Sequence, residues 1–227
     1  MKRQIATTRD NSKTLFVPEL DEHYHSIHGA VQESLHVFIK SGIKEFPDHS
    51  TVNILEVGLG TGLNVWLSLK EALERNLHIN YTSLEKYPVQ AEEVAQLNYT
   101  SLLPSGPKSS FQDIHECEWE KPVILHKEEA TSFTLLKQKT DLRAFKGSEN
   151  YNLIYFDAFA PSAQPNLWTV QVFQIMFEAL KPGGLLVTYC VKGEVRRAMK
   201  AAGFTVEKIP GPPGKREMAR AWKKGSL

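Results

Sequence analysis

From residue 47 onward, short hydrophobic runs alternate with segments whose apolar positions recur at helical spacing. The runs predict buried strands at 52–57, 79–84, 123–125, 151–156 and 185–191. Helices are predicted between them, at 64–75, 88–97, 133–137, 169–180 and 194–202. Strands that alternate with helices form a mostly parallel sheet with helices on both faces. The pattern therefore predicts an α/β fold with a doubly wound, mostly parallel sheet.

Both ends of the chain show patterns that predict antiparallel β-hairpins. An Asp-Asn-Ser turn predicts a β-hairpin over 3–18, and a helix is expected to end near residue 38. Residues 204–206 and 219–222 predict a second hairpin around a Pro- and Gly-rich loop. Segment 99–122 shows little pattern, so we expect a loop with a short helix there.

Composition indicates a single core. A chain of 227 residues, 41% of them hydrophobic, can bury a full domain core without metals or disulfides. We expect an N-terminal extension over 1–46 and one globular domain over 47–227. Cys117 and Cys190 stand far apart without zinc-ligand spacing, which favours a reducing compartment. No stretch approaches the roughly 18 apolar residues that span a bilayer, so we expect a cytoplasmic protein without a membrane segment.

Charge is unevenly distributed along the chain. The net charge is +1, yet the residues from 192 to the end carry ten Lys/Arg against three Glu, a local balance of +7. Such asymmetry suggests a surface that faces a polyanion. A solvated helix face followed by a basic tail explains the same asymmetry, so charge alone leaves both readings open.

A glycine-rich turn joins the first strand of the main sheet to its helix. Gly58, Gly60 and Gly62 let a ligand approach the backbone at the carboxyl end of the strand, where open α/β sheets bind ligands. A dinucleotide fingerprint would require glycine at 63, where this chain has Leu63. Glu56, just before the turn, suits a ligand with a cationic amino acid end better than a pyrophosphate. These features favour S-adenosylmethionine, which carries a sulfonium and an ammonium and no phosphate.

Two more acids follow strands of the same sheet. Glu85 can accept both ribose hydroxyls of an adenosine, as acids at this place do in dinucleotide sites. Asp157 ends the fourth strand beside the glycine turn, near the expected reacting group, although a loop-anchoring aspartate fits its position equally well. The aromatic and proline residues after it, Phe159 and Pro161, would wall a flat apolar pocket.

The run 157–169, Asp-Ala-Phe-Ala-Pro…Pro-Asn-Leu-Trp-Thr, resembles the signature of the MnmC methyltransferase-domain family. The glycine turn (55–64), the early Asp…Tyr…Ser…Gly…Glu spacing (21–33) and the late motifs (195–218) are also similar to that family. The resemblance covers nearly the whole chain, in order. It implies a Rossmann-like class I methyltransferase that uses S-adenosylmethionine to methylate the amine of 5-aminomethyl-2-thiouridine at the tRNA wobble position.

The resemblance also implies roles for individual residues. Asp157 would lie beside the reacting amine and accept its proton or orient its neutral form. The residues expected at the cofactor are Glu56, Gly58, Gly60, Gly62, Asn64, Glu85, Glu129, Tyr24 and Ser26. The residues expected at the base or the RNA backbone are Phe159, Pro161, Lys215 and Arg216. Glu129 aligns with the acid of a Gly-Asp-Ala motif near the adenine, and departs from it by being a glutamate. Trp168 is expected to pack the following helix.

Partners follow from the same resemblance. The expected macromolecular partner is tRNA, bound through its anticodon region, and methyl transfer needs no metal. Many relatives in this family carry an oxidase half that generates the aminomethyl group. Because this chain ends at Leu227, we expect a separate enzyme to supply that group.

Two other functions remain open at this point. The first is an enzyme that acts on a free small amine, either a methyltransferase or an aminopropyltransferase, whose activity would be indifferent to salt. The second is a non-catalytic RNA factor that binds S-adenosylmethionine and turns over nothing.

Overall fold

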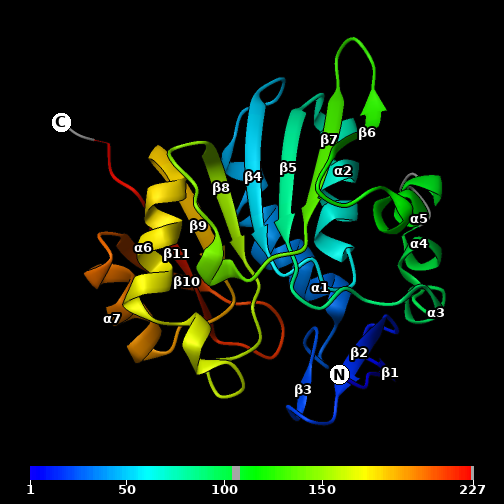
Figure 1. Ribbon diagram of the computed structural model, residues 1–227, viewed down its shortest axis with the longest axis horizontal. Helices are drawn as coiled ribbons and strands as arrows, with labels where there is room; N and C mark the ends of the chain where they lie inside the picture. Colours follow the sequence, from blue (N-terminus) through cyan, green and yellow to red (C-terminus); the bar gives the residue numbers. More distant parts are fainter. Residues whose placement is uncertain (104–107, 226–227) are drawn as a thin grey trace.

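The computed structural model describes residues 1–103 and 108–225, which form one large sheet, a small N-terminal sheet and flanking helices (Figure 1). The order of the large sheet is β10-β11-β9-β8-β4-β5-β7-β6. Its strands are β4 Thr51–Val57, β5 His78–Leu84, β6 Pro122–Lys127, β7 Ser132–Gln138, β8 Tyr151–Phe156, β9 Leu180–Thr188, β10 Thr205–Pro210 and β11 Glu217–Trp222. Neighbouring strands from β9 across to β7 pair in parallel, whereas β6 and β11 pair antiparallel to their neighbours. The predicted α/β class and mostly parallel sheet are confirmed.

Helices cover both faces of this sheet. They are α1 Ala30–Ser34, α2 Leu63–Arg75, α3 Ala91–Val94, α4 Tyr99–Leu102, α5 Lys108–Glu116, α6 Val170–Ala179 and α7 Gly193–Ala201. Helix α1 continues into a π-helical segment, Leu35–Lys40. Helices α6 and α7 lie on one face, and α1 and α2 lie on the other (Figure 1). Within the described ranges, no helix combines the length and apolarity needed to cross a membrane.

The alternation of side chains along the central strands creates the two cores. In β4, Ile54 belongs to the core under α2, and the next residue, Leu55, belongs to the core under α6. In β8, Tyr155 and Phe156 divide in the same way. Because successive strand residues point to opposite faces, a strand buried on both faces is hydrophobic throughout, which is why these runs were recognisable in the sequence.

The predicted N-terminal hairpin is confirmed and gains a third strand. Strands β1 Gln4–Thr7, β2 Lys13–Val17 and β3 Glu22–His23 form an antiparallel sheet. The Asp10 carboxylate stabilises the turn by accepting from the Thr8 hydroxyl and the Ser12 backbone amide. In Figure 1 this sheet lies below the large one, at the edge where the parallel strands have their carboxyl ends.

The helix expected over 133–137 is wrong, because this segment is strand β7. Phe133, Leu135 and Lys137 are buried while the residues between them are half-buried, which is the two-residue period of a strand. Lys137 occupies an inward position because its Nζ donates to the backbone carbonyl of His115 at 2.8 Å and lies 4.8 Å from the Trp119 ring centroid. Because Lys137 is polar but occupies a core position, the hydrophobic alternation of this strand could not be recognised in the sequence.

Smaller differences concern boundaries. The helix expected over 88–97 is only Ala91–Val94, capped by Gln90. Strand β9 begins at Leu180 rather than at the expected residue 185, because Gly183 and Gly184 exchange backbone hydrogen bonds with Lys223. Two short helices, rather than one, occupy the described part of 99–122, and positions 104–107 of the loop expected there lie outside the described residues.

The alternation in β7 leads to a stability prediction. Leu135→Ala should lower the free energy of unfolding by about 2–5 kcal/mol, because a fully buried leucine leaves a cavity. The control is Ile124→Ala on the neighbouring strand β6, where the side chain is 58% exposed and the loss should stay below about 0.5 kcal/mol. Urea denaturation measures both. Equal losses would contradict the assigned packing.

Candidate active site

A cavity of about 640 Å³ lies at the carboxyl ends of β4, β5, β7 and β8. The segment that follows β3 and the loop between β10 and β11 complete its wall. The N-terminal extension and the C-terminal hairpin, far apart in sequence, therefore meet over one edge of the large sheet.

The glycine turn forms the floor of this cavity. Gly58, Gly60 and Gly62 all have positive φ angles, of 90°, 52° and 74°. A Cβ atom at Gly58 would lie 3.0 Å from the carbonyl oxygen of Asp157, and one at Gly60 would lie 3.0 Å from the Tyr24 ring. Gly58 and Gly60 line the cavity, whereas Gly62 caps α2 against the side chain of His115. Only glycine allows the strand tips and the covering ring to approach so closely.

The carboxylate of Glu85 is fixed beside this turn. Its Oε2 accepts from the backbone amide of Gly60 at 3.1 Å, and its Oε1 accepts from the amide of Tyr87 at 2.7 Å. Since an ionised carboxylate has about four acceptor sites, two remain for hydroxyl groups of a ligand. Glu85 lines the cavity, and its geometry suits a ribose.

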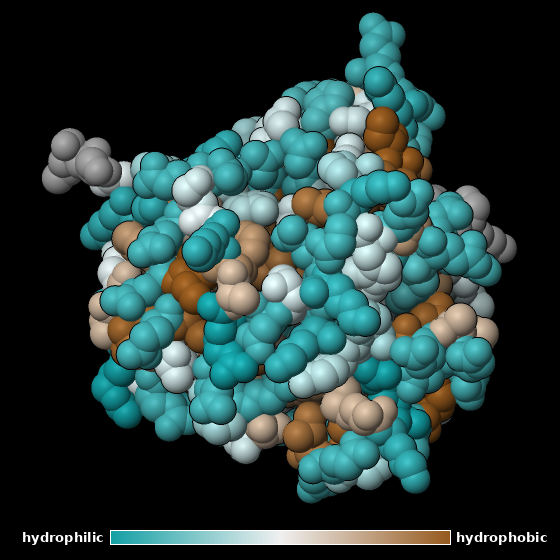
Figure 2. Space-filling model, in the orientation of Figure 1, coloured by the Kyte–Doolittle hydropathy of each residue, from teal (hydrophilic) through white to brown (hydrophobic). Residues whose placement is uncertain are grey.

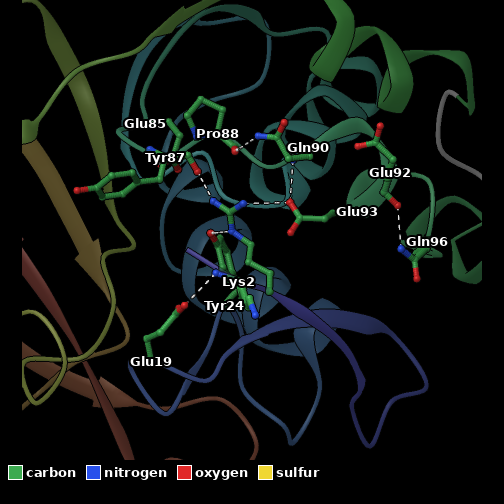
Figure 3. A network of polar contacts seen from close by, with 11 residues as sticks. Lys2, Glu19, Tyr24, Glu85, Tyr87, Pro88, Gln90, Glu92, Glu93 and Gln96 are labelled. Carbon is green, nitrogen blue, oxygen red and sulfur yellow. Dashed lines mark hydrogen bonds and ion pairs between the residues drawn. The ribbon is translucent and has the colours of Figure 1, made fainter.

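Tyr24 covers the turn from the N-terminal side. Its ring packs edge to face against Phe159, with the centroids 5.0 Å apart. Its hydroxyl accepts from Nε of Arg3 at 2.8 Å, and the same guanidinium donates to Glu93 at 3.0 Å and to the carbonyl of Tyr87 (Figure 3). Burial raises the pKa of Tyr24 to about 12, so the phenol is neutral. Arg3 thereby fastens the N-terminal strand to the loops beyond β5.

Asp157 lies at the tip of β8, half-buried in the cavity wall. Its Oδ2 accepts from Nδ2 of Asn64 at 2.9 Å, and its backbone amide donates to Val57. Burial raises the pKa of this carboxyl to about 7, and the nearby charge of Glu33 adds to the effect, while Asn64 and Lys215 oppose it. A carboxyl that titrates near neutral pH can accept a proton from a ligand there.

Glu33 and Tyr189 also belong to the cavity wall and were missed as site residues. Glu33 accepts from Nζ of Lys215 and from the backbone amide of Ser26. The same Nζ lies 3.8 Å from the Tyr189 ring centroid, and the Tyr189 hydroxyl donates to the carbonyl of Ala158. Ser26 and Lys215 line the cavity with them. The position of Tyr189 just after β9 could have indicated it, because every neighbouring strand tip contributes to the site.

The residues expected at the base lie at different depths. Phe159 lines the cavity, and its carbonyl accepts from Nε1 of Trp168 at 2.8 Å. Pro161 is buried behind the lining, and Arg216 is exposed next to Lys215. Trp168 is buried among core rings, as expected of a packing residue.

Besides Gly62, two residues expected at the cofactor do not line the cavity. Glu56 is fully buried behind the turn, where its Oε2 accepts from the Ser83 hydroxyl at 2.6 Å. Glu129 lies in the turn between β6 and β7, next to Ser132, which pairs with the first residue of β5. This places it at the opposite edge of the sheet from the cavity, in the hairpin whose projecting tip is hydrophilic (Figures 1 and 2).

Asp141 lines the cavity where the adenine acid was expected. It follows the carboxyl end of β7, one strand beyond Glu85 in the sheet. Its carboxylate accepts from Arg143 and Lys86, and the Arg143 guanidinium holds the pKa of that carboxyl below its usual range. Because 133–137 was taken for a helix, the acid after this strand was not recognised in the sequence.

Comparisons with known proteins identify the type of domain. Residues 117–224 match a family model described as S-adenosyl-L-methionine-dependent methyltransferase. The chain is 30% identical over 221 residues to the tRNA 5-methylaminomethyl-2-thiouridine biosynthesis bifunctional protein MnmC of Cupriavidus metallidurans, a match that covers 93% of the chain and 33% of the relative. The protein of the same name from Leptospira borgpetersenii is 31% identical over 232 residues, covering 92% of the chain and 33% of the relative. The chain thus spans about a third of the length of these relatives.

A solved structure extends the likeness to three dimensions. The crystal structure of MNMC2 from Aquifex aeolicus superposes with a TM-score of 0.76 at 27% identity, covering 100% of this chain and 72% of that one. The family model names S-adenosyl-L-methionine as the cofactor, and the sequence relatives and the solved structure are MnmC proteins. The chain is an MnmC-like, S-adenosyl-L-methionine-dependent methyltransferase domain with the class I fold.

Proposed function

We propose that this domain transfers a methyl group from S-adenosylmethionine to the primary amine of 5-aminomethyl-2-thiouridine at the wobble position of tRNA. The observation that carries the proposal is Asp157, a carboxyl with a pKa of about 7 in the same cavity as the glycine turn. The relatives reported above are named for the biosynthesis of 5-methylaminomethyl-2-thiouridine in tRNA. This nucleoside carries a methylamino group, which methyl transfer to a primary amine creates.

The residues around the cavity fit the cofactor. Gly58 and Gly60 line the cavity without side chains of their own, which leaves their backbone open to a ligand, and Glu85 would hold the ribose hydroxyls. Asp141 and Leu142, after β7, line the side of the cavity where an adenine would extend beyond that ribose. When bound, S-adenosylmethionine supplies an electrophilic methyl group to an incoming nucleophile.

Asp157 would manage the proton of the methyl acceptor. An alkyl amine is mostly protonated near neutral pH, and only its neutral form has a lone pair for attack. The Asp157 carboxylate would take that proton, while Lys215 and Glu33 stand as a fixed ion pair on the neighbouring wall. Phe159 and Tyr24 offer apolar ring edges to a flat base. A wobble base is already single-stranded, so its entry into the cavity requires little unpairing.

The basic C-terminal region supports an RNA substrate. Several of its cations form ion pairs, including Lys208 with Glu217 and Arg220 with Glu207. Five exposed cations have no ion-pair partner within residues 1–103 and 108–225, namely Lys192, Arg197, Lys200, Arg216 and Lys224. Arg216 stands next to Lys215, which lines the cavity, and an unpaired cation there suits a phosphate backbone. We propose further that a separate active site supplies the primary amine.

Substitution of Asp157 tests the catalytic role. Asp157→Asn should lower kcat/KM by roughly 10²- to 10⁴-fold, the usual contribution of a general base. The ratio of wild-type to variant rate should fall as the pH drops below about 7, because the wild-type carboxyl is then protonated and can no longer accept a proton. Nucleoside mass spectrometry of tRNA that carries aminomethyluridine measures the gain of one methyl group. Near-wild-type turnover by the variant would exclude a chemical role for Asp157.

Salt dependence tests the RNA substrate. In Arg197→Gln/Arg216→Gln, the slope of log affinity for tRNA against log salt concentration should decrease in magnitude by roughly 1.4–1.8, since each lost phosphate contact removes about 0.7–0.9. The control is Lys208→Gln, which removes a cation already paired with Glu217 and should leave the slope nearly unchanged. Filter binding from low to moderate salt measures the slope. Salt-independent turnover of a free small amine by the wild type would favour the small-molecule alternative.

A further inference from the structure

A buried row of three side chains links the interior of the sheet to the cavity. Glu56 on β4 is fully inaccessible, Asn64 at the start of α2 is 3% exposed, and Asp157 opens into the cavity. Asn64 donates from Nδ2 to Asp157 at 2.9 Å. On its other side the Asn64 amide lies close enough to Glu56 to influence the pKa of that carboxyl through hydrogen bonding. An amide therefore stands between two carboxyl groups.

Two oxygen atoms of this row lack a hydrogen-bond donor. Among the described residues, Glu56 Oε1 and Asn64 Oδ1 are both buried without a partner. Leaving a buried acceptor unsatisfied is unfavourable, and native structures contain few such atoms. A proton on Oε1 of Glu56 would donate to Oδ1 of Asn64 and satisfy both oxygens at once.

The chemistry of the amide leads to the same conclusion. An asparagine side chain donates only from nitrogen and accepts only at oxygen. The Asn64 oxygen can only accept, so it pairs with Glu56 only where that carboxyl carries a proton. In the observed orientation the nitrogen serves Asp157, so the proton belongs on Glu56.

The surroundings of Glu56 favour the protonated form. Ser83 and Tyr81 approach from β5 with hydroxyl groups, and Tyr155 approaches from β8. Asp157 adds a negative charge, which disfavours a second carboxylate nearby. Burial raises the pKa of Glu56 to about 8, and the hydrogen bond from Ser83 only partly offsets this effect.

We propose that Glu56 is a positioning residue that carries a proton at neutral pH and, through Asn64, holds the Asp157 carboxylate oriented toward the methyl acceptor. This rests on the proposed function in that Asp157 acts there as the base. Glu56 was expected at the ammonium of the cofactor, and its burial behind the turn assigns it this second role instead.

Two substitutions separate this role from simple packing. Glu56→Gln keeps a donor for Asn64 and an acceptor for Ser83, so kcat at pH 7 should stay within about threefold of wild type. Glu56→Leu removes the donor and should lower kcat by about 10- to 100-fold. Both should bind S-adenosylmethionine within about twofold of wild type in calorimetry. Circular dichroism establishes that each is folded, and Glu71→Gln, another buried glutamate of the same domain, is the matched control.

The pH profile is the decisive kinetic readout. With a pKa of about 8, roughly nine-tenths of Glu56 is ionised at pH 9, and Asn64 then loses its donor. The ratio of the Glu56→Gln rate to the wild-type rate should rise about tenfold between pH 7 and pH 9. The same ratio for Glu71→Gln should stay flat. A flat ratio for Glu56→Gln would overturn the proposal.

A spectroscopic readout keeps this proposal distinct from the proposed function. The infrared difference spectrum between wild type and Glu56→Gln should show the carbonyl stretch of a protonated carboxylic acid at pH 7, lost above pH 9, whatever the substrate. Absence of that band, or a cofactor dissociation constant raised more than about tenfold in Glu56→Gln, would overturn the positioning role. A wild-type enzyme that shows the band but leaves aminomethylated tRNA unmethylated would contradict only the proposed substrate.

Discussion

The close approach of two strand tips determines the site. Strands β4 and β8 run side by side, and the amide of Asp157 donates to the carbonyl of Val57 just before the chain turns at Gly58. Gly58 has no side chain, and a Cβ atom there would lie 3.0 Å from the carbonyl oxygen of Asp157. Glycine therefore allows the two strand tips to approach this closely. This contact brings the glycine turn and the Asp157 carboxyl into one cavity. The other residues of the site are arranged around that pair.

The ends of the chain close the cavity with charged contacts of partly buried groups. Arg3 ties the N-terminal strand to Glu93 and to the hydroxyl of Tyr24, and Lys215 ties the C-terminal hairpin to Glu33. Charge-assisted bonds in partly buried surroundings are stronger than exposed surface pairs. The two contacts hold segments from opposite ends of the sequence over the same strand tips, so the shape of the cavity depends on the whole chain.

The sequence predicted those features that depend only on neighbouring residues. The buried strands, the glycine turn and the acids at 85 and 157 stand in short runs whose meaning does not depend on distant residues. Asp141 was missed because a lysine at an inward position of β7 disguised the strand that precedes it. Glu129 was expected instead from its alignment with the acid of a Gly-Asp-Ala motif. The pairing of Glu33 with Lys215 spans 182 positions and leaves no local trace. Glu56 could have been placed better, because strand alternation puts it on the face of β4 that α2 covers.

The central claim is that the turn at Gly58 forms one binding site for S-adenosylmethionine with the tip of β8. Isothermal titration of the wild type and of Gly58→Ala with S-adenosylmethionine tests it most directly. The account predicts one site per chain in the wild type and at least about tenfold weaker binding in the variant, whose added Cβ must displace the carbonyl of Asp157. Equal affinity in the two proteins, or no binding by the wild type, would contradict it.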